Sequence, residues 1–229
     1  MCTWWKAALP SALLLLTPLA GRTAGAQGAV GGRITILERS GVRTTDLANA
    51  VVYLEPAAGA RALGTATTQI VMESREFVPR VRVVTVGSTV EFPNQDPFRH
   101  NVFSNTGPAA FDLGLYERGA SKGATLRQAG VYPVFCNIHA RMVAFVLAIA
   151  TPYFTQAGAD GRFTVANVPA GRYTLRAWHD RGGEQARQLD VPAAGVSDVS
   201  VELDARGYRP VPHKNKFGQE YTTAGRDRY

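Results

Sequence analysis

Residues 131–150 read VYPVFCNIHARMVAFVLAIA and contain two apolar runs, Val131–Cys136 and Met142–Ala150, on either side of a short polar segment. Short apolar runs that are rich in valine and aromatic residues are typical of β-strands. At the end of the first run stands the spacing C-x2-H-x2-M, formed by Cys136, His139 and Met142. The stretch therefore predicts two strands joined by a loop that carries a thiol, an imidazole and a thioether.

The rest of the chain repeats the strand pattern and shows almost no helical periodicity. Further short apolar or alternating runs are Arg33–Leu37, Ala50–Leu54, Val81–Val86, Thr89–Phe92, Arg162–Val165, Arg172–Trp178, Ala186–Val191 and Val199–Leu203. Turn residues such as glycine, proline and asparagine separate these runs, as they do in antiparallel sandwiches and barrels. We therefore predict an all-β fold.

The strand runs fall into two sets, which predict two domains. Pro152 interrupts the first set, so we place a boundary near Thr151–Gln156. The expected domains are 27–150 and 151–205, followed by a basic, extended tail over 206–229. Because the second unit has only about 50 residues, it is expected to be a minimal sandwich that leans on its neighbour.

The first 26 residues resemble an export signal. A start containing Lys6 precedes an apolar stretch, Ala7–Ala20, and the small-residue site Ala24-Gly25-Ala26. A stretch of this length with two prolines is too short for a membrane-spanning helix, which needs roughly 20 apolar residues. We predict cleavage after Ala26 and export to the periplasm or the medium, with an uncleaved anchor as the alternative.

Composition narrows the functional class. The chain has 229 residues, of which 45% are hydrophobic and 19% charged, and these fractions exclude wholesale disorder. Loss of Lys6 and Arg22 with the signal lowers the formal charge from +7 to +5. The remaining positive charges are dispersed, so the chain lacks a nucleic-acid-binding tract, and an acidic protein partner is favoured.

Cys136 is the most informative residue. Because Cys2 leaves with the signal, the exported chain has one thiol with no disulfide partner, and such a thiol is prone to oxidation unless it is bound by a ligand. A second histidine, His100, lies beside the predicted strand Thr89–Phe92. Two imidazoles, one thiolate and one thioether form the donor set that suits copper in both oxidation states. Zinc is a weaker candidate because thioether is not one of its usual ligands. A Cys-His nucleophilic pair and a buried structural cysteine remain as alternatives.

These motifs resemble the cupredoxins, and most closely the plastocyanin and amicyanin branch, including proteins labelled as methylamine-utilisation proteins. The resemblance covers about Gln69–Ile149 and rests on Val86–Asn94, His100-Asn101, Gly130-Val131-Tyr132 and the loop from Cys136 to Met142. It implies a Greek-key sandwich with one type 1 copper ion.

Residue roles follow from this resemblance. His100, Cys136 and His139 would be equatorial ligands and Met142 the axial one, while Asn101 would tie the two ligand segments together. Ala140 departs from the pattern, because relatives usually have proline there. Side chains expected to exclude water or to steer an acidic partner are Phe98, Phe135, Arg99, Arg141 and Lys122.

The second set of strands resembles a carboxypeptidase-regulatory or transthyretin-like module. The resemblance rests on Asp160–Val165 and Asn167–Leu175 and implies a small β-sandwich that acts as a spacer or interaction platform. His179 is expected to be a half-buried histidine at a strand end, and His213 a solvated residue of the tail.

The sequence thus predicts an exported one-electron carrier rather than an enzyme, working between redox protein partners. The alternatives are a periplasmic copper carrier or storage protein, and a structural β-protein with a vestigial metal site.

Overall fold

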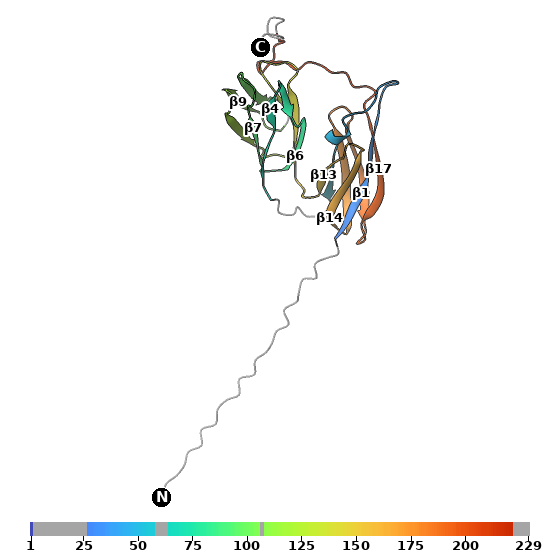
Figure 1. Ribbon diagram of the computed structural model, residues 1–229. Helices are drawn as coiled ribbons and strands as arrows, with labels where there is room; N and C mark the ends of the chain where they lie inside the picture. The colour runs from blue at the N-terminus through green and yellow to red at the C-terminus, as the bar shows by residue number, and fades with distance from the viewer. Residues whose placement is uncertain (2–26, 58–63, 106–107, 222–229) are drawn as a thin grey trace.

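The computed structural model describes residue 1 and residues 27–57, 64–105 and 108–221 (Figure 1). Over these residues the regular structure is β, apart from one turn of 3-10 helix, η1 (Leu47–Asn49). The predicted all-β class, with two β-sandwiches, is confirmed. Among the described residues there is no helix of the length and apolarity that a membrane crossing requires. Residues 2–26 of the predicted export signal lie outside the described residues.

The central sandwich is built from ten strands between residues 64 and 150. Its strands are β3 (Thr67–Gln69), β4 (Val71–Glu73), β5 (Glu76–Val78), β6 (Val81–Thr85), β7 (Thr89–Pro93), β8 (His100–Ser104), β9 (Phe111–Tyr116), β10 (Ser121–Thr125), β11 (Gly130–Phe135) and β12 (Val143–Ile149). One sheet has the order β6-β12-β11-β8-β9 and the other β10-β7-β3, with the hairpin β4-β5 beside them. Phe92, Tyr132 and Val134 are among the buried side chains of the core.

A second body, the flanking sandwich, contains seven strands from both ends of the described chain. Its strands are β1 (Gln27–Leu37), β2 (Val51–Pro56), β13 (Phe154–Gln156), β14 (Arg162–Pro169), β15 (Gly171–His179), β16 (Gly183–Val191) and β17 (Val196–Asp204). They form the sheets β14-β1-β17 and β13-β2-β15-β16. Figure 1 shows β1, β14 and β17 side by side in one body, apart from β7 and β9 in the other. At Gly32 a Cβ atom would lie 1.9 Å from the Val199 carbonyl oxygen, so β1 and β17 approach in a way that only glycine permits.

The strand pairing differs from the expected domain boundaries. The sequence prediction placed 27–150 in the first domain, but β1 pairs with β14 and β17, and β2 pairs with β13 and β15. The physical reason is core size, because residues 151–205 alone offer too little apolar surface for two facing sheets. Ile34 and Leu54, at most 1% exposed, supply part of the missing core. The central sandwich therefore lies between two segments of the flanking sandwich.

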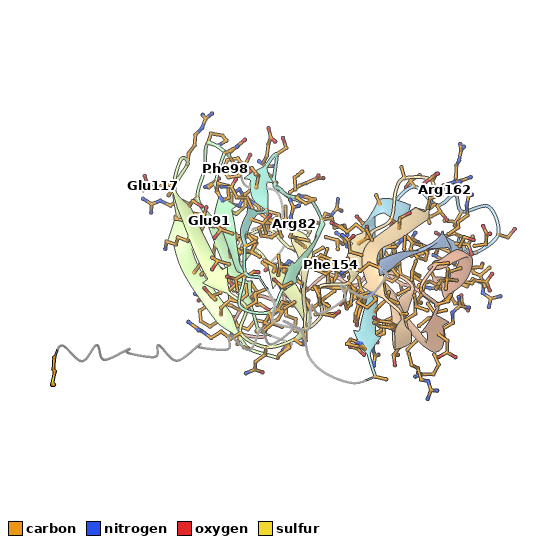
Figure 2. The ribbon with its side chains drawn as sticks, turned by 90° about the horizontal axis from the view of Figure 1, so that it is seen from below. Arg82, Glu91, Phe98, Glu117, Phe154 and Arg162 are labelled. Atoms are coloured by element: carbon orange, nitrogen blue, oxygen red, sulfur yellow. The ribbon has the colours of Figure 1, made fainter. Side chains whose placement is uncertain are left out.

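The two sandwiches are joined by a shared apolar cluster and an ion pair. The cluster contains Val51, Val81, Leu147, Ile149 and Trp178, with Phe154 packed against it. The rings of Trp178 and Phe145 lie 5.5 Å apart, and Arg80 Nε lies 2.8 Å from Asp180 Oδ2. In Figure 2, Phe154 lies between the two bodies. Because most of this contact is buried and apolar, the two sandwiches hold each other in a fixed arrangement.

The tail leaves the flanking sandwich after β17 and returns to the central sandwich (Figure 1). Residues 206–221 of the expected tail contain no strand or helix, and residues 222–229 lie outside the described residues. The expectation that His213 is solvated was wrong. Its ring is half-buried and stacked on Phe135, with ring centroids 4.5 Å apart.

Candidate metal centre

Two adjacent strands and one tight loop bring the predicted ligands together. His100 is the first residue of β8, and Cys136 directly follows β11, which pairs with β8. His139 and Met142 lie in the loop before β12, where the Met142 N–H donates to the His139 carbonyl at 3.1 Å. The Cys136 N–H donates in turn to the Met142 carbonyl at 3.3 Å. These two main-chain bonds close the loop and fix the spacing of its side chains.

Three donor atoms form a nearly equilateral triangle. Cys136 Sγ lies 3.6 Å from His100 Nδ1 and 3.5 Å from His139 Nδ1, and the two Nδ1 atoms are 3.2 Å apart. The centre of such a triangle is about 2 Å from each corner, close to the usual metal–nitrogen and metal–sulfur bond lengths. The residues present therefore fit a metal ion bound in a trigonal plane by one sulfur and two nitrogens.

The thiol is buried but surrounded by main-chain donors. Cys136 is 0% exposed, and burial raises the pKa of its thiol. Main-chain N–H groups of Ile138, Asn101 and His139 act in the opposite direction and lower that pKa, because they donate to the sulfur. The same N–H groups would stabilise a thiolate once a cation is bound beside it.

Both histidines favour the neutral form that can bind a metal. Burial, followed by the neighbouring His100, lowers the pKa of His139 to about 4. Burial also lowers the pKa of His100, although Asp96 opposes this effect. Near neutral pH each ring therefore offers an unprotonated nitrogen, as metal binding requires.

Asp96 fixes the orientation of His100. The His100 Nε2–H donates to Asp96 Oδ2 at 2.7 Å, which leaves the Nδ1 lone pair directed into the donor triangle. The carboxylate also accepts the N–H groups of Ser74 at 2.7 Å and Arg75 at 2.9 Å. Burial tends to raise the Asp96 pKa, but these three donors together hold it below its ordinary value. Sequence reasoning missed Asp96, and its only signal was an acidic side chain four residues before a predicted ligand.

Met142 lies in the same buried cluster as Cys136 and is 1% exposed. Burial is compatible with either a core thioether or an axial ligand. Its expected axial role therefore remains a prediction.

Asn101 does not tie the ligand segments together through its side chain. Its amide Nδ2 donates to Asp112 Oδ1 at 2.7 Å, away from the ligand loop. The connection runs instead through the Asn101 main-chain N–H, which donates to Cys136 Sγ. A main-chain donor is independent of side-chain identity, so the sequence could not reveal it.

An aromatic ring and several cations surround the donor triangle. The Phe98 ring lies 5.1 Å from that of His100 and 5.7 Å from that of His139, with the Arg75 guanidinium 5.2 Å above it. Figure 2 shows Phe98 at one end of the central sandwich. Two of the expected steering cations have other partners, because Arg99 pairs with Glu117 and Lys122 donates to the Leu113 carbonyl. Arg141 is exposed beside the ligand loop.

A second group of potential ligands, Asp46, His179 and Asp180, lies in the flanking sandwich. His179 is fully buried, more than expected, and both its ring nitrogens have partners. Its Nε2 donates to the Asp46 carbonyl at 3.1 Å, and its Nδ1 accepts the Arg181 N–H at 3.1 Å. Arg181 also pairs with the Asp46 carboxylate. These contacts indicate a structural network rather than a metal site.

Comparison with known proteins gives a partial likeness. No protein-family model matches the sequence, and no curated protein matches it. Among solved structures, a purple cupredoxin from Nitrosopumilus maritimus is 22% identical, with a TM-score of 0.34, and covers 36% of this chain and 99% of its own. Amicyanin from Paracoccus versutus is 23% identical, with a TM-score of 0.33, over 42% of this chain and 91% of its own.

A copper-containing nitrite reductase from Thermus scotoductus is 26% identical, with a TM-score of 0.35, over 51% of this chain and 28% of its own. The neighbours are thus cupredoxin structures, and the likeness is confined to about half of the chain or less. The donor triangle, rather than these likenesses, is the feature from which a function can be proposed.

Proposed function

We propose that this chain is a one-electron carrier that holds one type 1 copper ion. The proposed equatorial ligands are His100, Cys136 and His139, and the proposed axial ligand is Met142. The observation that carries the proposal is the buried triangle of one sulfur and two Nδ1 atoms, with edges of 3.2–3.6 Å. This donor set is a compromise between the preferences of Cu(II) and Cu(I). Bound copper would supply the one-electron couple.

The surrounding residues support electron transfer rather than substrate chemistry. His100 and Cys136 are 0% exposed, so solvent and substrates have little access to that side of the triangle. His139 is half-exposed and lies beside Phe98, which places its ring between the buried donors and the surface. Because the loop is closed by its own main-chain bonds, the donors have little freedom to rearrange between oxidation states. A non-enzymatic carrier fits these features best.

The proposed partners are redox proteins with an acidic docking face. Arg75 lies over the Phe98 ring, and Arg141 is exposed in the ligand loop, so positive charge borders the exposed edge of His139. Complementary charge increases association rates of this kind, and the effect decreases with ionic strength. With the predicted export signal, the proposed location is the periplasm or the medium.

The flanking sandwich is proposed to be a carboxypeptidase-regulatory or transthyretin-like module without chemistry of its own. Two members of its group of potential ligands, Asp46 and His179, are engaged by Arg181 and main-chain contacts. The fixed contact with the central sandwich supports a role as a rigid platform that orients the copper domain.

The proposal is tested by loading the metal-free protein with Cu(II). We expect one ion per chain, an intense visible absorption from the Cu(II)–thiolate bond, and reversible bleaching by a one-electron reductant. Cys136→Ser should lose the colour while its far-ultraviolet circular dichroism stays that of the wild type. A wild type that binds Zn(II) tightly but stays colourless with Cu(II) would refute the type 1 assignment. Blue protein that releases copper whenever it is reduced would favour a copper carrier over an electron carrier.

A further inference from the structure

The C-terminal segment 208–221, here called the strap, contacts the metal centre at several points. It leaves the flanking sandwich, crosses a groove of about 650 Å³ and reaches the strand end that bears Cys136. Residues from both sides line the groove, including Arg141 of the ligand loop and Pro210 of the strap. The groove therefore separates the first part of the strap from the ligand loop. The later part of the strap contacts the segment that carries Cys136.

We propose that the strap is a working part of the metal centre, with Tyr221 as a positioning residue that raises the reduction potential and limits access to Cys136. This inference rests on the proposed electron-carrier function and extends it to residues outside the central sandwich.

Tyr221 makes the most direct contact. Its hydroxyl donates to the main-chain carbonyl of Cys136 at 2.6 Å, the residue whose sulfur completes the donor triangle. The tyrosine is half-buried, and a phenol ordinarily ionises only at about pH 10, so the hydroxyl keeps its proton near neutral pH. A permanent O–H dipole thus points its positive end at the thiolate-bearing residue.

His213 fixes the position of Tyr221. Its ring stacks on Phe135 at 4.5 Å and meets the Tyr221 ring edge-to-face at 5.3 Å. Its Nδ1 donates to the Lys214 carbonyl at 3.0 Å, which orients the ring within the strap. Phe135 directly precedes Cys136, so the stack covers the strand end on the side of the strap.

Lys216 connects the strap to both ligand segments. Its main-chain N–H donates to Asn137 Oδ1 at 2.9 Å, next to Cys136. Its ammonium donates to Asp112 Oδ2 at 2.7 Å, and the other oxygen of Asp112 accepts the Asn101 side-chain amide at 2.7 Å. Because Asn101 follows His100, one strap residue contacts the ligand loop and reaches the β8 segment through Asp112.

The expected electrostatic effect has a definite sign. The O–H dipole of Tyr221 places partial positive charge near a centre whose reduction adds one electron. Positive charge there stabilises Cu(I) more than Cu(II), so the contact raises the potential. Removing the hydroxyl should lower it. The strap also covers the strand end, so its removal should expose the thiol of the metal-free protein.

The test uses the full chain with Cys2→Ser, so that Cys136 is the single thiol. Tyr221→Phe removes only the hydroxyl. Tyr173→Phe is the matched control, because it removes a hydroxyl that also donates to a main-chain carbonyl, that of Pro169 at 2.9 Å, in the flanking sandwich. At a fixed solution potential we expect the Cu(I)/Cu(II) ratio of Tyr221→Phe to fall about threefold, equivalent to about 28 mV. Tyr173→Phe should keep the wild-type ratio.

A second measurement needs no copper. An aromatic disulfide reagent should label Cys136 of the metal-free protein about tenfold faster after truncation at Arg206, and about threefold faster in Tyr221→Phe. Blue variants with wild-type potential and wild-type labelling would overturn the role of the strap and leave the electron-carrier proposal intact. A wild type that never becomes blue would overturn the electron-carrier proposal, and the strap's effect on potential with it, whatever the labelling rates.

Discussion

Replacement of Asp96 by asparagine should raise the reduction potential of the proposed copper site. The carboxylate accepts the His100 Nε2–H at 2.7 Å and is nearly buried, with a side chain that is 7% exposed. Its negative charge would stabilise bound Cu(II) relative to Cu(I) through the imidazole ring. Asparagine is similar in shape but neutral, so it removes this preference and makes reduction easier.

The size of the shift follows from the distance between the charge and the donor triangle. Across the width of the imidazole, the carboxylate lies about 6 to 7 Å from the centre of the triangle, where a unit charge contributes about 2.5 kcal/mol at an effective dielectric constant of about 20. That energy corresponds to nearly two decades in the equilibrium, or about 110 mV. The N–H groups of Ser74 and Arg75 already offset part of the charge. We therefore expect an increase of about 50 to 110 mV.

Potentiometric titration of the wild type, Asp96→Asn and Asp160→Asn tests this expectation. Asp160 is an exposed carboxylate of the flanking sandwich, so its replacement makes the same change in net charge far from the site. In the Asp96→Asn variant the new side-chain amide would face two N–H donors, so unfolding of the metal-free variant should cost about 1–3 kcal/mol less. A folded, blue Asp96→Asn protein with a potential equal to that of Asp160→Asn, or lower than the wild type, would refute the reasoning.

Four further outcomes are expected. Met142→Leu should keep copper and colour but raise the potential, whereas His100→Ala should lose the ion, and equal copper loss in both would contradict the axial role. N-terminal sequencing of exported protein should begin at Gln27, and a start at Met1 would support the membrane anchor. Trp178→Ala should lower the free energy of unfolding by about 3 kcal/mol and separate the unfolding of the two sandwiches, and a single unchanged transition in calorimetry would contradict this. Metal-free protein should lose stability as the pH falls from about 6.5 towards 4, because His139 has a pKa lowered to about 4 and the unfolded chain takes up the proton first. For a half-exposed ring we expect a loss of about 1–2 kcal/mol, measured by urea unfolding across that pH range.

Local patterns in the sequence predicted the loop ligands and those strands that have a marked apolar or alternating run. Val131–Cys136 and Val81–Val86 alternate or run apolar, and both correspond to observed strands, β11 and β6. The strand β10 has four exposed residues in five and lacks that alternation, so it was missed. Cys136 and His139 were recognisable because their spacing is local.

Long-range features were not recognisable from local pattern. The contact of Tyr221 with Cys136 joins residues 85 positions apart, and neither residue type nor spacing indicates it. The pairing of β1 with β17 has the same character, because a strand's own sequence does not specify which of several similar strands lies beside it. The domain prediction therefore assigned β1 to its neighbours in sequence, although its hydrogen-bonded partners come more than a hundred residues later.

The pairing of β1 with β17 also determines which sandwich can fold first as the chain emerges from the ribosome or a translocation channel. Ile34 pairs with Val201, so the sheet that contains β1 can form only after almost the whole remaining chain has emerged. The central sandwich lies between these two strands in the sequence and can form earlier, because the contacts of β11 with β12 and of β8 with β9 are local. Low contact order favours rapid folding, and distant pairing delays it. The central sandwich should therefore acquire its structure first, as an insert whose two ends are not yet fixed, and the sheet that contains β1 and β17 should form last and hold both ends of the insert.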